Sequence, residues 1–266
     1  MGYKRVVLDH DSDIIFNINL DKMISSKDTP IIVEAKKFNS NNELRAHYNN
    51  HGWVSLKKFI PKKIISILES DFDKIAFNIC GLKFEKAVIY LNKKNKDKLH
   101  QLCKDVQNTS SHMYLIKTFN EKYKKIFNKH QPIINLGQFV LPGPPADKRL
   151  IYSFHQESNY YKEYNTTAHF HFPIFNNTNL ENGSMSVLSK THKLKRIKEI
   201  KNYKIRGGFL SVVPKNLNQL IDKYSHITFD LKLGDLLLFD GNLVHKSNLN
   251  KTKKCRVVGI HRIAQI

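Results

Sequence analysis

The second half of this chain is divided into short apolar segments that leave no room for long helices. After residue 130 these segments, rich in Val, Ile, Leu and Phe, follow one another with Gly, Pro, Asn or Asp between them. They read INLGQFVL, LIYSFHQE, AHFHFPIF, GSMSVL, GGFLSVV, HITFDL, DLLLFD and CRVVGIHRI. Segments of this length and composition are typical of β-strands. So many in succession predict a mainly β fold, a sandwich or a jelly roll.

The first half predicts helices that flank this β core. TPIIVEA is expected to form a strand, and NELRAHYNNHGWVSLKKFI a short helix, a stop at Gly52 and a strand from Trp53. Pro61 fits the first turn of the next helix, because its missing N–H is not needed there. Apolar residues then recur at helical spacing. Further helices are expected at 84–107 and 116–126.

Two histidines and a carboxylate near the predicted strands could hold a metal ion. His155 and Glu157 alternate in FHQE, and alternate residues of a strand point to one face. The segment GDLLLFDGNLVH predicts a turn and a strand that bring His245 to the strand's far end. Two histidines and one carboxylate can fill one face of a metal's coordination sphere. With 13 histidines in the chain, however, a chance match to HxE is expected, and a lone His or Glu is more often a surface group or a paired core group.

Arg256 begins the last predicted strand, RVVGIHRI. If this strand returns antiparallel to the one that ends near His245, the two side chains come close together. A guanidinium that faces a β core is costly unless it meets an anion. Its planar fork suits a carboxylate. Arg256 is therefore a candidate clamp for a dicarboxylate.

Four segments in order resemble the phytanoyl-CoA dioxygenase family of iron(II)/2-oxoglutarate oxygenases. NELRAHYNNHGWVSLKKFIPKKIISILESDFDKI is similar to the start of that family, and FHQESNYY to its WHQD segment. FHFPIFNNTNLENGSMSVLSKTHK resembles its strand, ENG turn and SH segment, and GDLLLFDGNLVHKSNLN its distal-histidine block. The resemblance covers residues about 42–262. It implies a double-stranded β-helix, a cupin-like jelly roll, in a domain at 42–266, with an extension at 1–41 packed on or preceding the core.

The resemblance also implies roles for individual residues. The implied iron(II) ligands are His155, Glu157 and His245. Arg256 would clamp 2-oxoglutarate, the cosubstrate consumed with O2, and Ser247 and Gln138 lie where the family often has further cosubstrate contacts. Position 157 is Glu where the family usually has Asp. The carboxylate is kept, which disfavours the halogenase variant of this site.

Two further pairs of residues have more than one interpretation. His169 and His171 alternate in AHFHFPIF and could line the substrate pocket or serve the structure. Arg256 and Arg262 are similar to the RxxxxxR pair of nucleic-acid dealkylating oxygenases. The shorter interval from His245 and the phytanoyl-type segments argue against that branch. We expect Arg262 to pair with a nearby carboxylate or with solvent.

The net charge of +21 is the outlier of the composition. It favours an anionic partner, but the lysines are spread along the chain without interleaved aromatic residues, so nucleic acid is an unfavoured partner. No apolar run approaches the roughly 20 residues that span a bilayer, and the N-terminus does not resemble a secretory signal. The three cysteines form no CxxC pair, so we expect a reducing cytoplasm.

The expected function is hydroxylation of a small metabolite, with an anionic one favoured, and release of succinate and CO2. The same iron site also supports desaturation, epimerisation or demethylation. Two alternatives remain open. One is a catalytically silent binding protein that kept the fold, and the other is a nucleic-acid dealkylase of the same superfamily.

Overall fold

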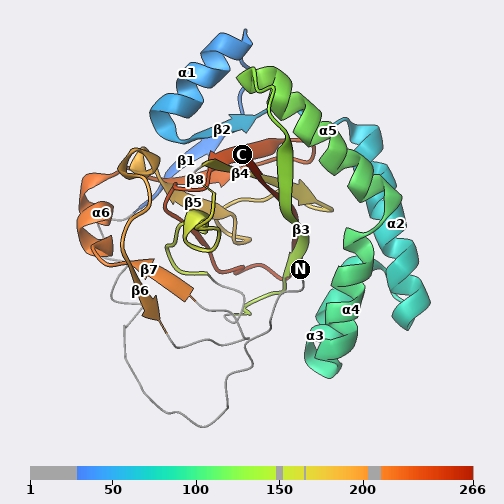
Figure 1. Cartoon of the computed structure of the whole chain (residues 1–266). Helices are drawn as coiled ribbons and strands as arrows, with labels where there is room; N and C mark the ends of the chain where they lie inside the picture. The colour runs from blue at the N-terminus through green and yellow to red at the C-terminus, as the bar shows by residue number, and fades with distance from the viewer. Residues whose placement is uncertain (1–28, 148–151, 165, 203–210, 266) are drawn as a thin grey trace.

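The computed structural model describes residues 29–147, 152–164, 166–202 and 211–265, and its centre is a sandwich of two sheets (Figure 1). The five-stranded sheet has the order β2 (Trp53–Leu56), β9 (Leu236–Asp240), β4 (Thr166–Ile174), β11 (Arg256–Gln265) and β3 (Ile133–Gly143). The four-stranded sheet has the order β1 (Ile31–Glu34), β8 (His226–Asp230), β5 (Met185–Leu188) and β10 (His245–Ser247). Apolar side chains of both sheets, such as Val187 and Leu237, pack together between them. The fold is the double-stranded β-helix, or jelly roll.

Helices cover the outer face of the five-stranded sheet (Figure 1). They are α1 (Asn41–His51), α2 (Lys62–Cys80), α3 (Phe84–Lys94), α4 (Lys96–Gln107) and α5 (Ser110–Phe127). Phe119 of α5 stacks on Phe170 of β4 with ring centroids 5.1 Å apart, and Phe172 meets Phe119 edge-on. These rings bury the apolar face of the sheet that would otherwise be exposed to solvent. Since Phe170 and Phe172 face the helices, the alternating side chains of β4, His169 and His171, lie on the other side of the sheet.

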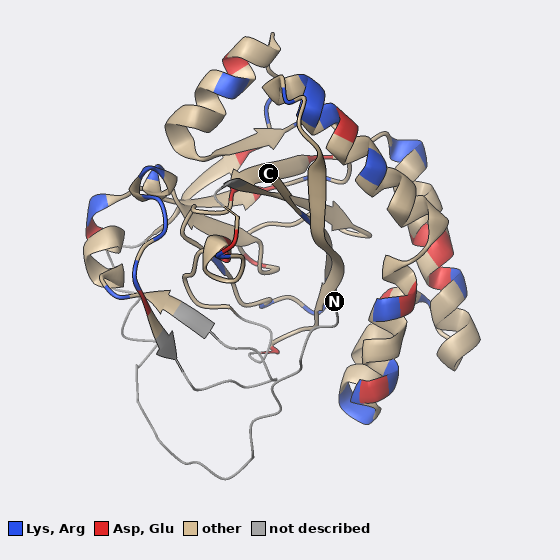
Figure 2. Ribbon diagram, viewed as in Figure 1, with Lys and Arg blue, Asp and Glu red and all other residues tan. Residues whose placement is uncertain are grey.

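Smaller elements complete the described chain. They are β6 (Glu199–Asn202), β7 (Ser211–Pro214), α6 (Leu217–Lys223) and the 3-10 turns η2 (Glu157–Asn159) and η3 (Thr191–Leu194). None of the described helices is long and apolar enough to cross a membrane. None of the Lys, Arg, Asp and Glu residues of α1 to α5 is buried, and Figure 2 shows how they are distributed along these helices.

Several local predictions are confirmed. Gly52 ends α1 with φ +81°, and its N–H bonds the Tyr48 carbonyl at 2.7 Å. A Cβ at this position would also meet the His192 ring at 2.5 Å, so glycine is required twice over. Pro61 caps α2, as its position before the apolar helical repeat predicts. Strand β1 pairs with β8, while the domain division at residue 41 stays a prediction.

Other local predictions are wrong. The stretch 84–107 forms two helices, because Asn95 caps α4 by accepting a hydrogen bond from the Lys98 N–H at 3.0 Å. FHQE is not a strand: His155 makes an isolated bridge to His245, and Glu157 opens a 3-10 turn. The segments LIYSFHQE and GGFLSVV lie partly outside the described residues. The sequence patterns also did not predict β6, β10 or α6.

Candidate metal centre

His155 and His245 are brought together by backbone pairing. Their N–H groups bond each other's carbonyls at 2.9 and 3.0 Å, which places the two imidazole centroids 4.2 Å apart. Both residues are buried, and burial, together with the neighbouring His155 ring, lowers the pKa of His245. His155 and His245, which are far apart in the sequence, thus lie next to each other in the structure.

Hydrogen bonds fix the tautomer of both rings. Nδ1 of His155 lies 2.7 Å from the Ser153 carbonyl, and Nδ1 of His245 lies 2.9 Å from the Leu243 carbonyl. A carbonyl can only accept, so Nδ1 carries a proton in each ring, and in the neutral form of the ring the lone pair is on Nε2. Neutral imidazoles with this second contact are the usual form of metal-ligating histidine. Both Nε2 atoms are therefore free to bind a cation.

Glu157 faces these two nitrogens. Its Oε1 lies 3.7 Å from Nε2 of His155 and 3.8 Å from Nε2 of His245. The ligand atoms of the three residues all lie within 4.8 Å of one another, and all three residues are buried. Burial raises the pKa of Glu157, but the Arg262 guanidinium, together with hydrogen bonds from His155 and His245, outweighs burial and holds the pKa well below its usual range. The carboxylate is consequently ionised and ready to meet a cation.

Glu157 reaches this place through a turn and not through strand alternation. The Ser158 N–H bonds the Gly241 carbonyl at 3.0 Å and ties the 3-10 turn to the end of β9. Between the two ligands, Gln156 points elsewhere: its amide donates to the Lys195 carbonyl at 2.8 Å, and its Oε1 accepts from the Ile197 N–H at 2.8 Å. The opposite directions of Gln156 and its neighbours are as predicted, although the backbone is not a strand.

Arg256 is a buried cation with no carboxylate partner among the described residues. Its exposed fraction is 7%, and its Nε has no hydrogen-bond partner. Burial lowers the pKa of this guanidinium to about 10. Gly143 lies beside it, and a Cβ there would come within 3.0 Å of the guanidinium nitrogens. A buried guanidinium whose Nε lacks a partner fits an anion such as the carboxylate of a bound cosubstrate.

His169 and His171 project from β4 toward the same region. His169 is fully buried, stacks on Phe239 at 5.1 Å, and neither of its ring nitrogens has a partner. Burial lowers its pKa well below the usual range, while the Glu157 charge acts in the opposite direction. Burial and the charge of Arg256 lower the pKa of His171 to about 3. Both rings are thus neutral and lie near residues of the candidate metal centre, and a pocket-lining role for them stays a prediction.

Ser247 and Gln138 have different positions. Ser247 lies on β10 two residues beyond His245, and its N–H bonds the Tyr152 carbonyl at 3.0 Å. Gln138 pairs with His261, and its amide contacts Met113 of α5 at 3.4 Å. This is the helix-covered side of the sheet. The structure therefore does not bring Gln138 to the metal-site residues, and we do not propose it as a cosubstrate contact.

Arg262 is the residue whose role the sequence patterns did not assign. Its Nη2 donates to Oε1 of Glu157 at 2.8 Å, so the nearby carboxylate that we expected as its partner is the candidate metal ligand itself. The available signal was the even spacing from Arg256, which places both arginines on one face of β11.

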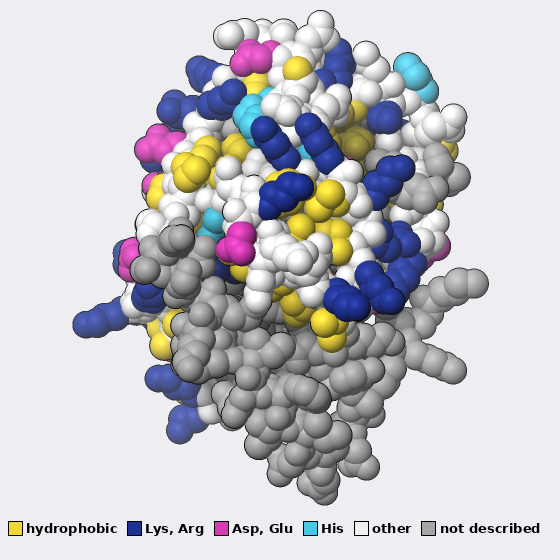
Figure 3. All heavy atoms as spheres, turned by 90° about the vertical axis from the view of Figure 1, so that its left-hand side faces the viewer, with side chains coloured by type: hydrophobic (Ala, Val, Ile, Leu, Met, Phe, Trp, Pro, Cys, Tyr) yellow, Lys and Arg dark blue, Asp and Glu magenta, His cyan; other side chains and the backbone are white. Residues whose placement is uncertain are grey.

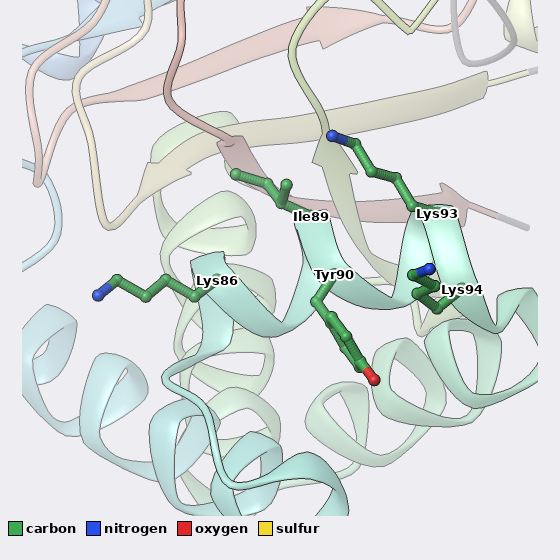
Figure 4. A pocket seen from close by; sticks show the side chains of 5 residues that line it. All are labelled: Lys86, Ile89, Tyr90, Lys93 and Lys94. Carbon is green, nitrogen blue, oxygen red and sulfur yellow. The ribbon is translucent and has the colours of Figure 1, made fainter.

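Two open surface hollows lie away from these residues. One, of about 330 Å³, is bordered by Lys86, Tyr90 and neighbours on α3 (Figure 4). The other, of about 490 Å³, lies around Asn176 and Thr252. Neither is lined by a residue of the candidate metal centre.

Comparison with known proteins identifies the family. A family model described as phytanoyl-CoA dioxygenase (PhyH) matches residues 48–258. The chain belongs to the phytanoyl-CoA dioxygenase family. This confirms the resemblance seen in the four segments, and it agrees with an oxygenase-type enzyme. A search of curated proteins finds no match.

Solved structures of low sequence identity share the fold. One is the epimerase SnoN in complex with Fe3+, α-ketoglutarate and nogalamycin RO, with a TM-score of 0.60 and 11% identity over 85% of this chain and 83% of that one. A second is EvdO2 from Micromonospora carbonacea var. aurantiaca complexed with 2-oxoglutarate, with a TM-score of 0.58 and 11% identity over 87% and 93% of the two chains. A third is the non-heme α-ketoglutarate-dependent carbocyclase SnoK, with a TM-score of 0.57 and 11% identity over 86% and 87%.

Proposed function

We propose that this protein is an iron(II)- and 2-oxoglutarate-dependent oxygenase. The observation that carries the proposal is the buried cluster of His155, Glu157 and His245, in which Oε1 of the carboxylate lies 3.7 and 3.8 Å from the two Nε2 atoms. Two nitrogens and one oxygen on one side of an ion are the donor set of non-heme iron(II) oxygenases. Family membership and the cosubstrates bound by SnoN and EvdO2 support the same assignment.

Each residue has a definite part in this proposal. His155, Glu157 and His245 hold iron(II), which supplies the activation of O2 with 2-oxoglutarate as the electron donor. Arg256 binds the distal carboxylate of 2-oxoglutarate, and Ser247 adds a contact to the cosubstrate. The rings of His169 and His171 line the substrate side of the site and, being neutral, neither attract nor neutralise the reacting carboxylates. The products from the cosubstrate are succinate and CO2.

We propose hydroxylation of a small anionic metabolite as the overall reaction. The support is the basic loop at 193–198, which Gln156 ties to the metal-ligand segment through its bonds to Lys195 and Ile197. Figure 2 shows Lys and Arg along this loop, on the left of the view. Figure 3, which faces that side, shows basic side chains predominating over acidic ones. A positive rim attracts anions by long-range electrostatics.

The unpaired Cys80, Cys103 and Cys255 support a reducing, cytoplasmic setting.

Succinate formation tests this function. Apoprotein is loaded anaerobically with iron(II), mixed with 2-oxoglutarate and exposed to O2, and succinate is measured over time. We expect slow, iron-dependent succinate release from the wild type and none above background from His245→Ala. The matched control is His100→Ala, which removes an exposed histidine of α4 and should behave as the wild type. Equal release from the wild type and His245→Ala would contradict the proposal. A folded protein that binds iron(II) and 2-oxoglutarate without turnover would favour the binding-protein alternative.

A further inference from the structure

Arg262 contacts the candidate metal ligand Glu157 directly. Its Nη2 lies 2.8 Å from Oε1, the same oxygen that lies 3.7 and 3.8 Å from the two histidine Nε2 atoms. A carboxylate oxygen has two lone pairs, so Oε1 can accept from Arg262 and still face a cation between the histidines. The side chain of Glu157 is 7% exposed and that of Arg262 is 18% exposed, so water competes little with this bond.

Arg262 is itself held in place from two sides. Its guanidinium carbon lies 4.8 Å from the centroid of the Phe139 ring, which gives a cation–π contact, and its Nη1 lies 3.5 Å from the Tyr161 hydroxyl. Gly137, opposite Arg262 in β3, has φ +146°, and a Cβ there would come within 2.8 Å of the Phe139 ring. Glycine at 137 therefore leaves room for the ring that supports the arginine.

A break in strand register occurs at the same place. The pairing of β11 with β3 shifts between Arg262 and Ile263, which is the mark of a β-bulge. Bulges change the direction of the side chains beside them and are frequent next to functional sites. Here the extra residue belongs to β3, between Asn135 and Gly137, so the bulge lies beside the strand segment that carries Phe139, the ring that supports Arg262.

The two arginines on this face of β11 have different partners. Arg262 is paired with a protein carboxylate, whereas Arg256 has none among the described residues. An arginine already bound to Glu157 is a poor clamp for an incoming dicarboxylate, and an unpaired one is a good clamp. This difference assigns Arg262 to the candidate metal centre as a partner of Glu157, and it leaves Arg256 as the candidate contact for the cosubstrate.

We propose that Arg262 is a positioning residue of the metal centre, which holds the carboxylate of Glu157 between His155 and His245. Glutamate has one more rotatable bond than the aspartate usual in this family, and a longer side chain has more conformations from which to be selected. The bond from Arg262, braced by Phe139, selects the one that faces both Nε2 atoms. This inference rests on the proposed function, because it takes the cluster to be a metal site.

Cobalt(II) binding to the apoprotein, without cosubstrate, tests the inference, because the two possible roles of Arg262 predict opposite changes in the cobalt(II) affinity of Arg262→Met. If Arg262 were only a neighbouring positive charge, Arg262→Met would remove a repulsion and tighten cobalt(II) binding. If Arg262 positions the carboxylate, the same change should weaken binding about ten- to a hundredfold. Arg262→Lys keeps the charge but loses the fork and the stacking geometry, so it should also weaken binding at least about tenfold. The visible absorption of bound cobalt(II) should change in shape in both variants, because the ligand geometry changes.

The control is Arg45→Met, which removes the same charge from α1, on the helix-covered side of the sheet, where Arg45 bonds the Ile126 carbonyl at 2.6 Å. It should bind cobalt(II) as the wild type does. If Arg262→Met fails to fold by circular dichroism, Arg262→Lys and Phe139→Leu decide, and wild-type affinity in both would overturn the inference. Equal or tighter binding by folded Arg262→Met would also overturn it while the proposed function stands. A wild type that binds no cobalt(II) would instead overturn the proposed function.

Discussion

Replacement of Arg256 by Met should make the ligand-free protein more stable and at the same time abolish tight binding of 2-oxoglutarate. Burial lowers the pKa of Arg256 from 12.5 to about 10. At about 1.4 kcal/mol for each pKa unit, the buried charge costs the folded state about 3 kcal/mol. This cost is fully present at every pH below about 10, since the guanidinium is then protonated in both the folded and the unfolded protein. Met has a similar length and no charge to desolvate.

We therefore expect Arg256→Met to raise the free energy of unfolding of metal-free, ligand-free protein by about 1–3 kcal/mol, measured by urea denaturation at pH 7. Calorimetric titration of cobalt(II)-loaded protein with 2-oxoglutarate should show binding weakened at least about 30-fold, as for the loss of one partner of a buried charge pair. The control is Arg45→Met. Arg45 is half-buried and bonds the Ile126 carbonyl at 2.6 Å, so its loss should lower stability by about 1 kcal/mol. Arg256→Met less stable than the wild type, or unchanged in 2-oxoglutarate affinity, would refute this reasoning.

Two further predictions concern stability alone. Burial lowers the pKa of His261 to about 4, so between pH 6.5 and 4 the unfolded protein binds a proton at this residue that the folded protein does not. As the pH is lowered through this range, His261 should decrease the unfolding free energy by about 1.4 kcal/mol per pH unit. His261→Gln should remove this part of the pH dependence in urea denaturation. A Cβ on Gly259 would lie 2.1 Å from the Phe172 ring, so Gly259→Ala should lower the unfolding free energy by about 1–3 kcal/mol, and an unchanged denaturation midpoint would show that the ring can move aside at no cost.

The predictable part of this fold is the part set by local sequence. Short apolar segments between turn residues predict the sheets, and the stop at Gly52 follows from the left-handed backbone that ends α1. The candidate metal ligands could be chosen from spacing and family resemblance, because His155 and Glu157 lie close in sequence and His245 ends a recognisable segment. The 3-10 turn that directs Glu157 toward the two histidines could not be predicted from the sequence, because it depends on hydrogen bonds to residues distant in the chain, such as Gly241.

Gln138 and Arg262 differ from expectation for separate reasons. The family resemblance implies a cosubstrate contact for Gln138, but the pairing of β3 with β11 places Gln138 opposite His261, and its amide contacts Met113 of α5. Arg262 bonds a partner 105 positions away, which neither periodicity nor composition can indicate.

The most direct test of the account is an anaerobic titration of the apoprotein with iron(II) followed by 2-oxoglutarate, observed by visible absorption. Chelation of iron(II) by the 2-oxo acid at the cluster of His155, Glu157 and His245 predicts a metal-to-ligand charge-transfer band in the wild type. The band should be lost in His245→Ala and greatly weakened in Arg256→Met at the same 2-oxoglutarate concentration. A folded wild-type protein that gives no such band, or a band that persists in His245→Ala, would contradict the assignment of this cluster as an iron and 2-oxoglutarate site.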